Sequence, residues 1–377
     1  MQKKLIALAV ASAAAAFASA PVMAQSSVSV YGVIDQALTS QNQQNGGTVT
    51  SLHGSGYTTE RLGFKGSEDM GNGLKANFVL ELGMNSDNGN LDNNYGGVNA
   101  TNPSLFQRVS TLGLSGASWG SVNFGRQYTP VFSIQAANDL FRVAGIGSIY
   151  SLTNVGVTRA SNSIRYDSPS MNGFSVAAMY GLGDTSIQGA AGNPAFLPGG
   201  VGMPSTGAAG APMNLGRQAG INGTYNNGPL MLGVGYNKLF LVAPVATFYD
   251  AQKTTAVTGS YDFKVVAINA GWQENKVDNN VADMTVWNVG ATVPVFGADS
   301  VKVSYSDRHD KLNSSDDSKL TALGYVHPMS KRTTLYATYA HMANDSAAKQ
   351  GFIFGYTGAI GTGFNPNGFQ LGLSHNF

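Results

Sequence analysis

Basic residues recur in segments of this chain that otherwise alternate between apolar and polar residues. Arg61 and Lys65 alternate with apolar neighbours, and so does Arg165. Successive side chains of a β-strand point to opposite faces, so these three cations lie on the polar faces of their predicted strands. Charges that face water in a narrow space attract counter-ions and orient dipolar solutes without carrying out a reaction. We therefore expect a surface that filters or binds solutes.

Four further charged residues are candidates for the same surface. The face of Arg108 is ambiguous, because Leu112 and Leu114 have the same phase in the alternation. Arg126 shares the phase of apolar neighbours, so it requires a bulge, or a position beyond the spanning part of the strand, to reach water. Asp35 and Glu81 occupy the polar phase of early segments. The two acids either face the same water-filled space or pair with the arginines and hold the wall.

A long segment of about residues 127–161 carries charges of both signs, namely Asp139, Arg142 and Arg159. It is the longest candidate loop in the first half of the chain. Periodicity does not show whether such a loop stays on the surface or folds over a site. Both arrangements remain open from the residues alone.

The residue pattern gives little support to catalysis. The chain has no Cys and 5 His, and the metalloprotease pattern HExxH does not occur. Ser306 and His309 lie in one strand-like segment, but alternation sends them to opposite faces. The Gly-rich stretches lack a phosphate-binding loop pattern, and Asp278, Asp316 and Asp317 are typical of solvated loops. We expect no enzymatic activity, no cofactor and no metal.

The composition indicates which elements position these residues. Hydrophobic residues make up 43% of the 377 residues and charged residues only 11%, less than half the charged share of ordinary soluble domains. The formal net charge of +1 argues against a nucleic-acid partner. Beyond residue 20, no apolar run approaches the ~20 residues of a membrane-spanning helix.

The first 24 residues have the pattern of a cleaved signal peptide. Lys3 and Lys4 precede an apolar stretch, and small residues precede Gln25. An uncleaved anchor helix is the alternative, but the apolar stretch is short for one. We predict a signal peptide at residues 1–24 and one domain at residues 25–377, which holds 20 basic and 21 acidic residues.

Period-two alternation continues to the C-terminus and predicts an all-β fold. Sixteen strands are predicted, beginning near residues 27, 59, 75, 106, 121, 162, 174, 217, 230, 253, 265, 283, 300, 319, 333 and 368. Short turns and long polar loops alternate between them, as in outer-membrane barrels. On the lipid face of such a barrel an arginine at mid-bilayer costs ~2–4 kcal/mol, so polar-phase arginines should face the lumen. A soluble β-sandwich is the alternative, but it leaves many strands without a second core-forming face.

Several stretches resemble a known family: Ser27–Asp35, Arg61–Ala76, Gly113–Pro130, Asn162–Pro169 and the terminal Phe377. They are similar to the general diffusion porins of β-proteobacteria, of the Burkholderia, Comamonas and Neisseria type. The resemblance covers nearly the whole chain after residue 24 and is weakest over residues 184–260.

This resemblance implies a homotrimer of sixteen-stranded antiparallel transmembrane β-barrels in the outer membrane of a Gram-negative bacterium, each with an inward-folded third loop. It implies contact with outer-membrane lipid and passive diffusion of small hydrophilic solutes and ions. The predicted constriction residues are Arg61, Lys65, Arg108, Arg126, Arg165, Asp35, Glu81, Asp139, Arg142 and Arg159. From the local arrangement of these charges we expect weak anion selectivity. A substrate-specific channel and a closed structural or adhesin barrel are the alternatives.

Overall fold

The computed structural model of the chain describes residues 27–44, 46–92, 105–153, 158–183, 217–240, 251–278, 280–353 and 360–377. The expected signal peptide at residues 1–24 and the Gly-rich insert at residues 184–216 lie outside these ranges. Within the described ranges, no helix is both long and apolar enough to cross a membrane.

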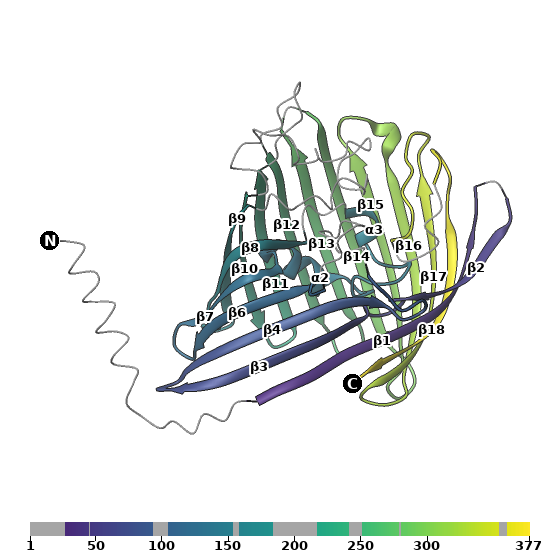
Figure 1. Cartoon of the computed structure of the whole chain (residues 1–377). Coiled ribbons are helices and arrows are strands. Elements are labelled where there is room, and N and C mark those ends of the chain that lie inside the picture. Colours follow the sequence, from purple (N-terminus) through teal and green to yellow (C-terminus); the bar gives the residue numbers. More distant parts are fainter. Residues whose placement is uncertain are drawn as a thin grey trace.

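Sixteen antiparallel strands form one closed barrel, as expected (Figure 1). The first strand, β1, pairs with β18 along one edge and with β3 along the other, which closes the circle. The barrel strands are β1 (Ser27–Asn42), β3 (Arg61–Gly71), β4 (Leu74–Asn85), β6 (Val109–Gly116), β7 (Gly120–Tyr128), β8 (Arg159–Asp167), β9 (Phe174–Leu182), β10 (Arg217–Asn227), β11 (Leu230–Phe240), β12 (Ala251–Asp262), β13 (Ala267–Val277), β14 (Ala282–Pro294), β15 (Ser300–Asp310), β16 (Ser318–Pro328), β17 (Thr333–Asn344) and β18 (Asn367–Asn376).

Two short strands were not expected from the sequence. β2 (Thr48–Gly54) pairs with the outer half of β1, and β5 (Asn90–Leu91) pairs with β4. The region around residues 40–57 is therefore not simply a loop, because its Thr- and Val-containing stretch has the propensity to extend the sheet. Residues 55–60 then leave the wall, and β3 continues the pairing along the inner half of β1.

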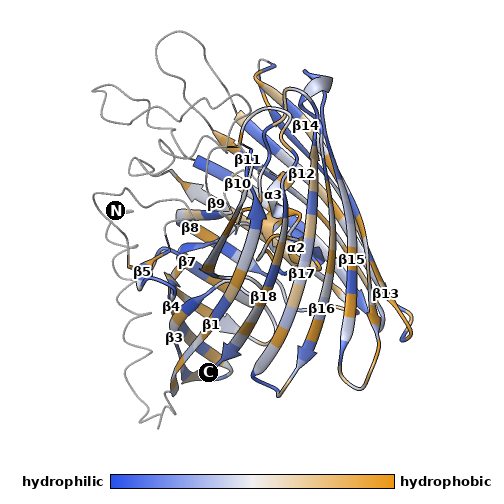
Figure 2. Ribbon diagram, turned by 90° about the vertical axis from the view of Figure 1, so that its right-hand side faces the viewer, coloured by the Kyte–Doolittle hydropathy of each residue, from blue (hydrophilic) through white to orange (hydrophobic). Residues whose placement is uncertain are grey.

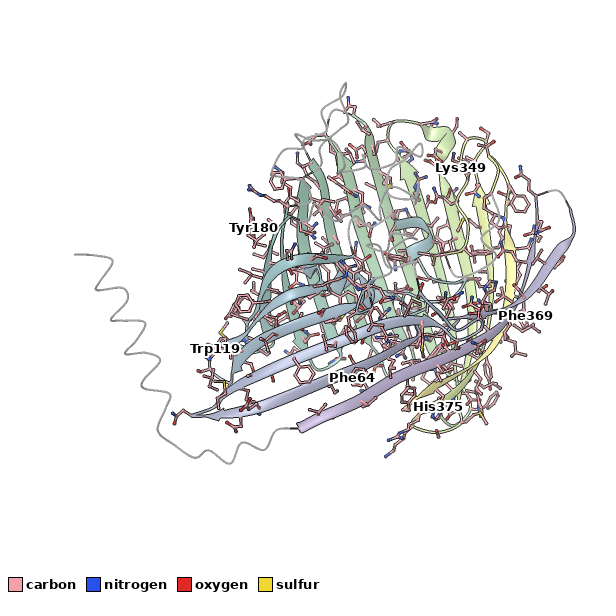
Figure 3. All side chains as sticks on the ribbon, viewed as in Figure 1. Phe64, Trp119, Tyr180, Lys349, Phe369 and His375 are labelled. Atoms are coloured by element: carbon pink, nitrogen blue, oxygen red, sulfur yellow. The ribbon has the colours of Figure 1, made fainter. Side chains whose placement is uncertain are left out.

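The outside of the barrel is apolar because apolar residues occupy every second position of its strands. On β1, Val28, Val30 and Leu38 are 65%, 58% and 53% exposed, whereas Asp35 on the opposite phase is fully buried. Figure 2 shows the same alternation of hydrophobic and hydrophilic residues along β15 to β18. Figure 3 shows Phe369 at the edge of the barrel, directed away from its interior. Such a surface suits lipid.

Short turns and long loops lie at opposite ends of the strands. The turn between β8 and β9 contains Asn172 and Gly173 at φ +52° and +89°, the left-handed region that tight turns require. Outer-membrane barrels have short periplasmic turns and longer outward loops. This turn therefore marks the periplasmic end of the barrel.

The loop between β7 and β8 lies against the inner wall, as Figure 1 shows for its helices α2 (Pro130–Asn138) and α3 (Tyr150–Thr153). We call residues 129–158 loop 3. Thr129 caps α2 by accepting a hydrogen bond from the N–H of Phe132 at 3.3 Å, and Pro130 occupies the first turn. An apolar cluster joins the loop to β14, β16 and β17 and contains Phe141, Ile146, Leu152, Val286, Leu320, Ala322, Ala340, Met342 and Phe352.

Asparagine side chains and glycines of the barrel wall form the surface on which loop 3 packs. Asn222 and Asn269 donate to the carbonyl oxygens of residues at the two ends of α2, at 2.6 and 2.5 Å. Added Cβ atoms at Gly235, Gly290 and Gly324 would lie 3.1, 2.5 and 2.9 Å from loop side chains. The amides satisfy backbone groups that a buried loop would otherwise leave unpaired, and the glycines let the loop approach closely.

Deletion of Phe377 should reduce the amount of folded barrel more than it changes conductance. Phe377 extends the seam beyond β18, where its N–H donates to the Gly32 carbonyl at 3.1 Å and its carbonyl accepts from the Gly32 N–H at 3.2 Å. Gly32 also makes room for the ring, since a Cβ there would lie 2.3 Å from it. Outer-membrane levels and single-channel conductance of the truncated chain test this. Normal levels would contradict it, and Phe377→Tyr, which keeps the aromatic ring, is the control.

Candidate functional site

Three arginines share hydrogen-bond partners on the inner wall between β3 and β8. We call this group the first basic cluster: Thr59, Arg61, Glu81, Arg108, Tyr128 and Arg159. Arg108 Nε lies 2.6 Å from Glu81 Oε1, and Arg108 Nη2 donates to the Tyr128 hydroxyl at 2.9 Å. Arg159 donates to the same hydroxyl at 2.7 Å, and its guanidinium lies 4.3 Å from the centroid of the Tyr128 ring. The tyrosine thus holds two cations through its hydroxyl and its ring face.

Arg61 joins this cluster through Thr59. Its Nη2 donates to Thr59 Oγ1 at 2.7 Å, and Arg108 Nη2 donates to the same oxygen at 3.3 Å. Arg61 lies on the inward phase of β3, opposite Val33 of β1, as the sequence alternation predicts. Lys65, two positions further along that phase, lies with its Nζ 5.2 Å from the ring centroid of Tyr31.

The positions of Arg108 and Arg159 differ from the sequence expectation. Arg108 precedes β6, so the alternation of that strand does not govern its direction; it is 1% exposed and bound to Glu81. Arg159 is the first residue of β8 and does not belong to the loop. Glu81 has the wall-holding role, because it binds Arg108 and accepts a hydrogen bond from Tyr31 at 2.9 Å.

A second basic cluster consists of Tyr57, Arg142 and Lys302. The Arg142 guanidinium and Lys302 Nζ lie 5.0 and 5.2 Å from the centroid of the Tyr57 ring. Lys302 also donates to the Leu140 carbonyl of loop 3 at 2.8 Å. Lys302 was not among the predicted site residues, although it is a polar-phase cation between Val301 and Val303 and the same rule that selected Arg165 would have found it.

One short segment connects the two clusters. Tyr57 and Thr59 are two residues apart in the stretch that leaves the wall after β2, which limits their Cα separation to ~7 Å. Together the clusters hold five cations, Arg61, Arg108, Arg142, Arg159 and Lys302, against the single carboxylate of Glu81. They form one cationic band between loop 3 and the wall.

Asp35 lies under this band and not on the lumen surface. The carboxylate is fully buried and accepts hydrogen bonds from the N–H groups of Gly56, Tyr57 and Thr58 at 3.1, 3.1 and 2.7 Å, and from the Tyr336 hydroxyl at 2.5 Å. Its role is to hold the segment that carries Tyr57. The expectation that Asp35 faces the pore or pairs with an arginine does not match this geometry.

Asp139 is likewise an internal anchor of loop 3. Its carboxylate accepts hydrogen bonds from the N–H groups of Phe141 and Val143 at 3.0 and 2.9 Å and from the Ser148 hydroxyl at 2.6 Å. Burial raises the pKa of the Asp139 carboxyl above its ordinary value. Arg142 and Val143 within this turn have φ of +61° and +55°, and the anchored turn directs Arg142 to Tyr57.

Arg165 and Arg126 have other hydrogen-bond partners than the two basic clusters' side chains. Arg165 faces inward as predicted, but Asp167 on the same strand binds it at 2.7 Å, and its Nη1 donates to the Tyr128 carbonyl and to Ser133 of α2. It therefore acts as a tether for the start of loop 3. Arg126 stands next to an irregularity in the register of β7 and donates to the Gln107 carbonyl at 2.5 Å and to Ser161 at 2.9 Å.

A closed, lipid-facing barrel with a charged band beside an inner loop defines a class of protein, the outer-membrane diffusion channels. The family model described as Gram-negative porin matches residues 9–347, and the chain belongs to that family. It is an outer-membrane porin, a passive channel and not an enzyme.

Similar proteins agree with this assignment over most or all of the chain. Outer membrane porin protein 32 of Delftia acidovorans is 33% identical, with 100% of both chains covered. Major outer membrane protein P.IB of Neisseria meningitidis serogroup B is 27% identical over 89% of this chain and 91% of its own. The solved structure of the anion-selective porin from Comamonas acidovorans has a TM-score of 0.77 at 29% identity and covers 94% of this chain and 100% of that one.

Proposed function

We propose that this porin is a weakly anion-selective general diffusion channel and that its two basic clusters set the sign of the selectivity. The observation that supports this is the excess of cations in the band, which remains five against four when the buried Asp35, Glu60 and Asp139 are counted beside Glu81. An anion that passes the band is attracted by several charges at once, and a cation is repelled. The similarity to a porin described as anion-selective agrees with this sign.

The test is single-channel recording in planar bilayers with a potassium chloride gradient. We expect stepwise openings and a zero-current potential of the sign that marks chloride preference. If folded protein produced no conductance steps in the bilayer, the chain would be a closed structural barrel. Saturation of the current by one class of solute at low concentration would indicate a substrate-specific channel. A potential of the opposite sign would contradict the selectivity that we propose.

We also propose a cleaved signal peptide at residues 1–24 and a homotrimer in the membrane. Lys3, Lys4 and the apolar stretch after them support the signal peptide, and the family resemblance supports the trimer. We expect a heat-modifiable complex that needs boiling in detergent to dissociate, because every barrel strand is paired on both edges. Gel mobility before and after boiling tests this, and identical mobility of a preparation that is shown to be folded would contradict it.

A further inference from the structure

A groove lies on the outer face of the barrel across β11, β12 and β13. Its volume is about 590 Å³, and its lining is almost entirely apolar. Its walls are formed by Leu232, Tyr261, Phe263, Ile268 and Trp272, which are 46%, 40%, 53%, 41% and 40% exposed. These side chains belong to the apolar phase that faces lipid, so the groove opens away from the lumen.

The groove exists because two small residues replace large ones in that outward phase. Gly259 pairs directly with Leu232 on one side and with Ala270 on the other. A Cβ at Gly259 would lie 3.2 Å from Leu232 Cδ2, so any side chain there would fill the floor. Along the rest of these strands the outward positions carry bulkier side chains such as Val234 and Val257.

The groove is at the periplasmic end of the strands. Its lining includes Leu230, which follows the turn after β10, and Phe263, which begins the turn after β12. Lys264 in this turn is 85% exposed at its side chain, and its Nζ lies 3.7 Å from Asp262 Oδ2. The ring centroid of Tyr261 lies 4.5 Å from that of Phe263, the lining residue that directly precedes Lys264.

We propose that this groove is a binding site for one phospholipid of the periplasmic leaflet, whose acyl chain lies over Gly259 and whose phosphate lies at Lys264. The groove is continuous with the lipid-facing surface of an outer-membrane porin, and its lining includes Tyr261 and Phe263 next to a periplasmic turn. Aromatic residues at the ends of spanning strands are typical of the level where headgroups meet acyl chains. A lysine beside an apolar groove matches a ligand with an anionic head and an apolar tail.

The first test uses Trp272 as a reporter inside the groove. The chain has 3 Trp, so a variant with Trp119→Phe and Trp287→Phe leaves Trp272 alone. In dodecyl maltoside, phosphatidylglycerol with brominated acyl chains should quench Trp272 fluorescence saturably and at lower concentration than brominated diacylglycerol, which lacks the phosphate. Lys264→Ala should remove this preference. Equal quenching by both lipids in the parent, or an unchanged preference in Lys264→Ala, would overturn the proposal.

The second test places a larger side chain at Gly259, on the floor of the groove. Gly259→Leu should weaken the quenching by roughly tenfold, the effect of excluding about two methylene groups from burial. The matched control is Gly223→Leu, because Gly223 is an outward glycine of β10 with only Val234 within reach of a Cβ, and it lies outside the groove. Unchanged quenching in folded Gly259→Leu would overturn the proposal. So would dissociation of the oligomer by Gly259→Leu alone, since a second copy would then cover the groove.

Discussion

Replacement of Arg61 and Arg142 together by Glu should turn the channel from anion preference to cation preference. Arg61 belongs to the first basic cluster and Arg142 to the second, and neither is fully buried. At ~6 Å a unit charge changes the energy of a passing ion by about 0.7 kcal/mol in a water-like medium. Each reversal changes two units of charge, so the pair amounts to ~2.8 kcal/mol, or about a hundredfold in anion occupancy before salt screening.

The measurement is the zero-current potential in a potassium chloride gradient, with recordings at low and high salt. The shift should shrink as salt rises, because ions screen the lumen charges. The matched control is Lys331→Glu with Arg332→Glu, which makes the same charge change on two exposed residues of a periplasmic turn. A control shift as large as that of the band variant would show that net charge, and not the clusters, sets the selectivity. An unchanged potential in the band variant would place these arginines outside the ion path.

Asp35→Ala should destabilise the barrel by roughly 3–5 kcal/mol and weaken its anion preference at the same time. The substitution leaves three N–H groups and the Tyr336 hydroxyl without their acceptor, and a buried unsatisfied donor costs ~1–3 kcal/mol. Part of this is recovered because the released segment can meet water. The segment carries Tyr57, on which Arg142 and Lys302 lie, so its release should disperse the second basic cluster.

Heat-modifiability on gels and the zero-current potential test the two parts of this prediction. Asp35→Asn should have a smaller effect, because the amide keeps one acceptor oxygen. Asp87→Ala removes an exposed acid of the next loop and serves as the control. If Asp35→Ala kept both its dissociation temperature and its selectivity, the buried carboxylate would not be the anchor of this segment.

The sequence by itself determined the barrel and the inward direction of several charges. Period-two alternation is a local property of the chain. Because a barrel wall has lipid on one side and water on the other, this alternation determines which side chains face the lumen. For this reason Arg61, Lys65 and Arg165 lie on the inward phase, as their neighbours indicate. The strand at Thr48–Gly54 was not predicted, because a short, mostly polar strand in a long loop has little contrast between apolar and polar positions.

Only the tertiary structure decided which charges act together. Asp35 and Arg61 each lie on the polar face of their own strand, so the sequence treats them alike. In the structure, the segment at residues 55–60 folds over Asp35, whereas Arg61 belongs to the cationic band. Arg165 has Asp167 two positions away on its own strand, whereas Lys302 on β15 reaches Tyr57 and Leu140, which are distant from it in the sequence. Alternation gives the face of a side chain but not its partner. Partners depend on barrel closure and on where loop 3 packs against the wall, which bring together residues more than a hundred positions apart.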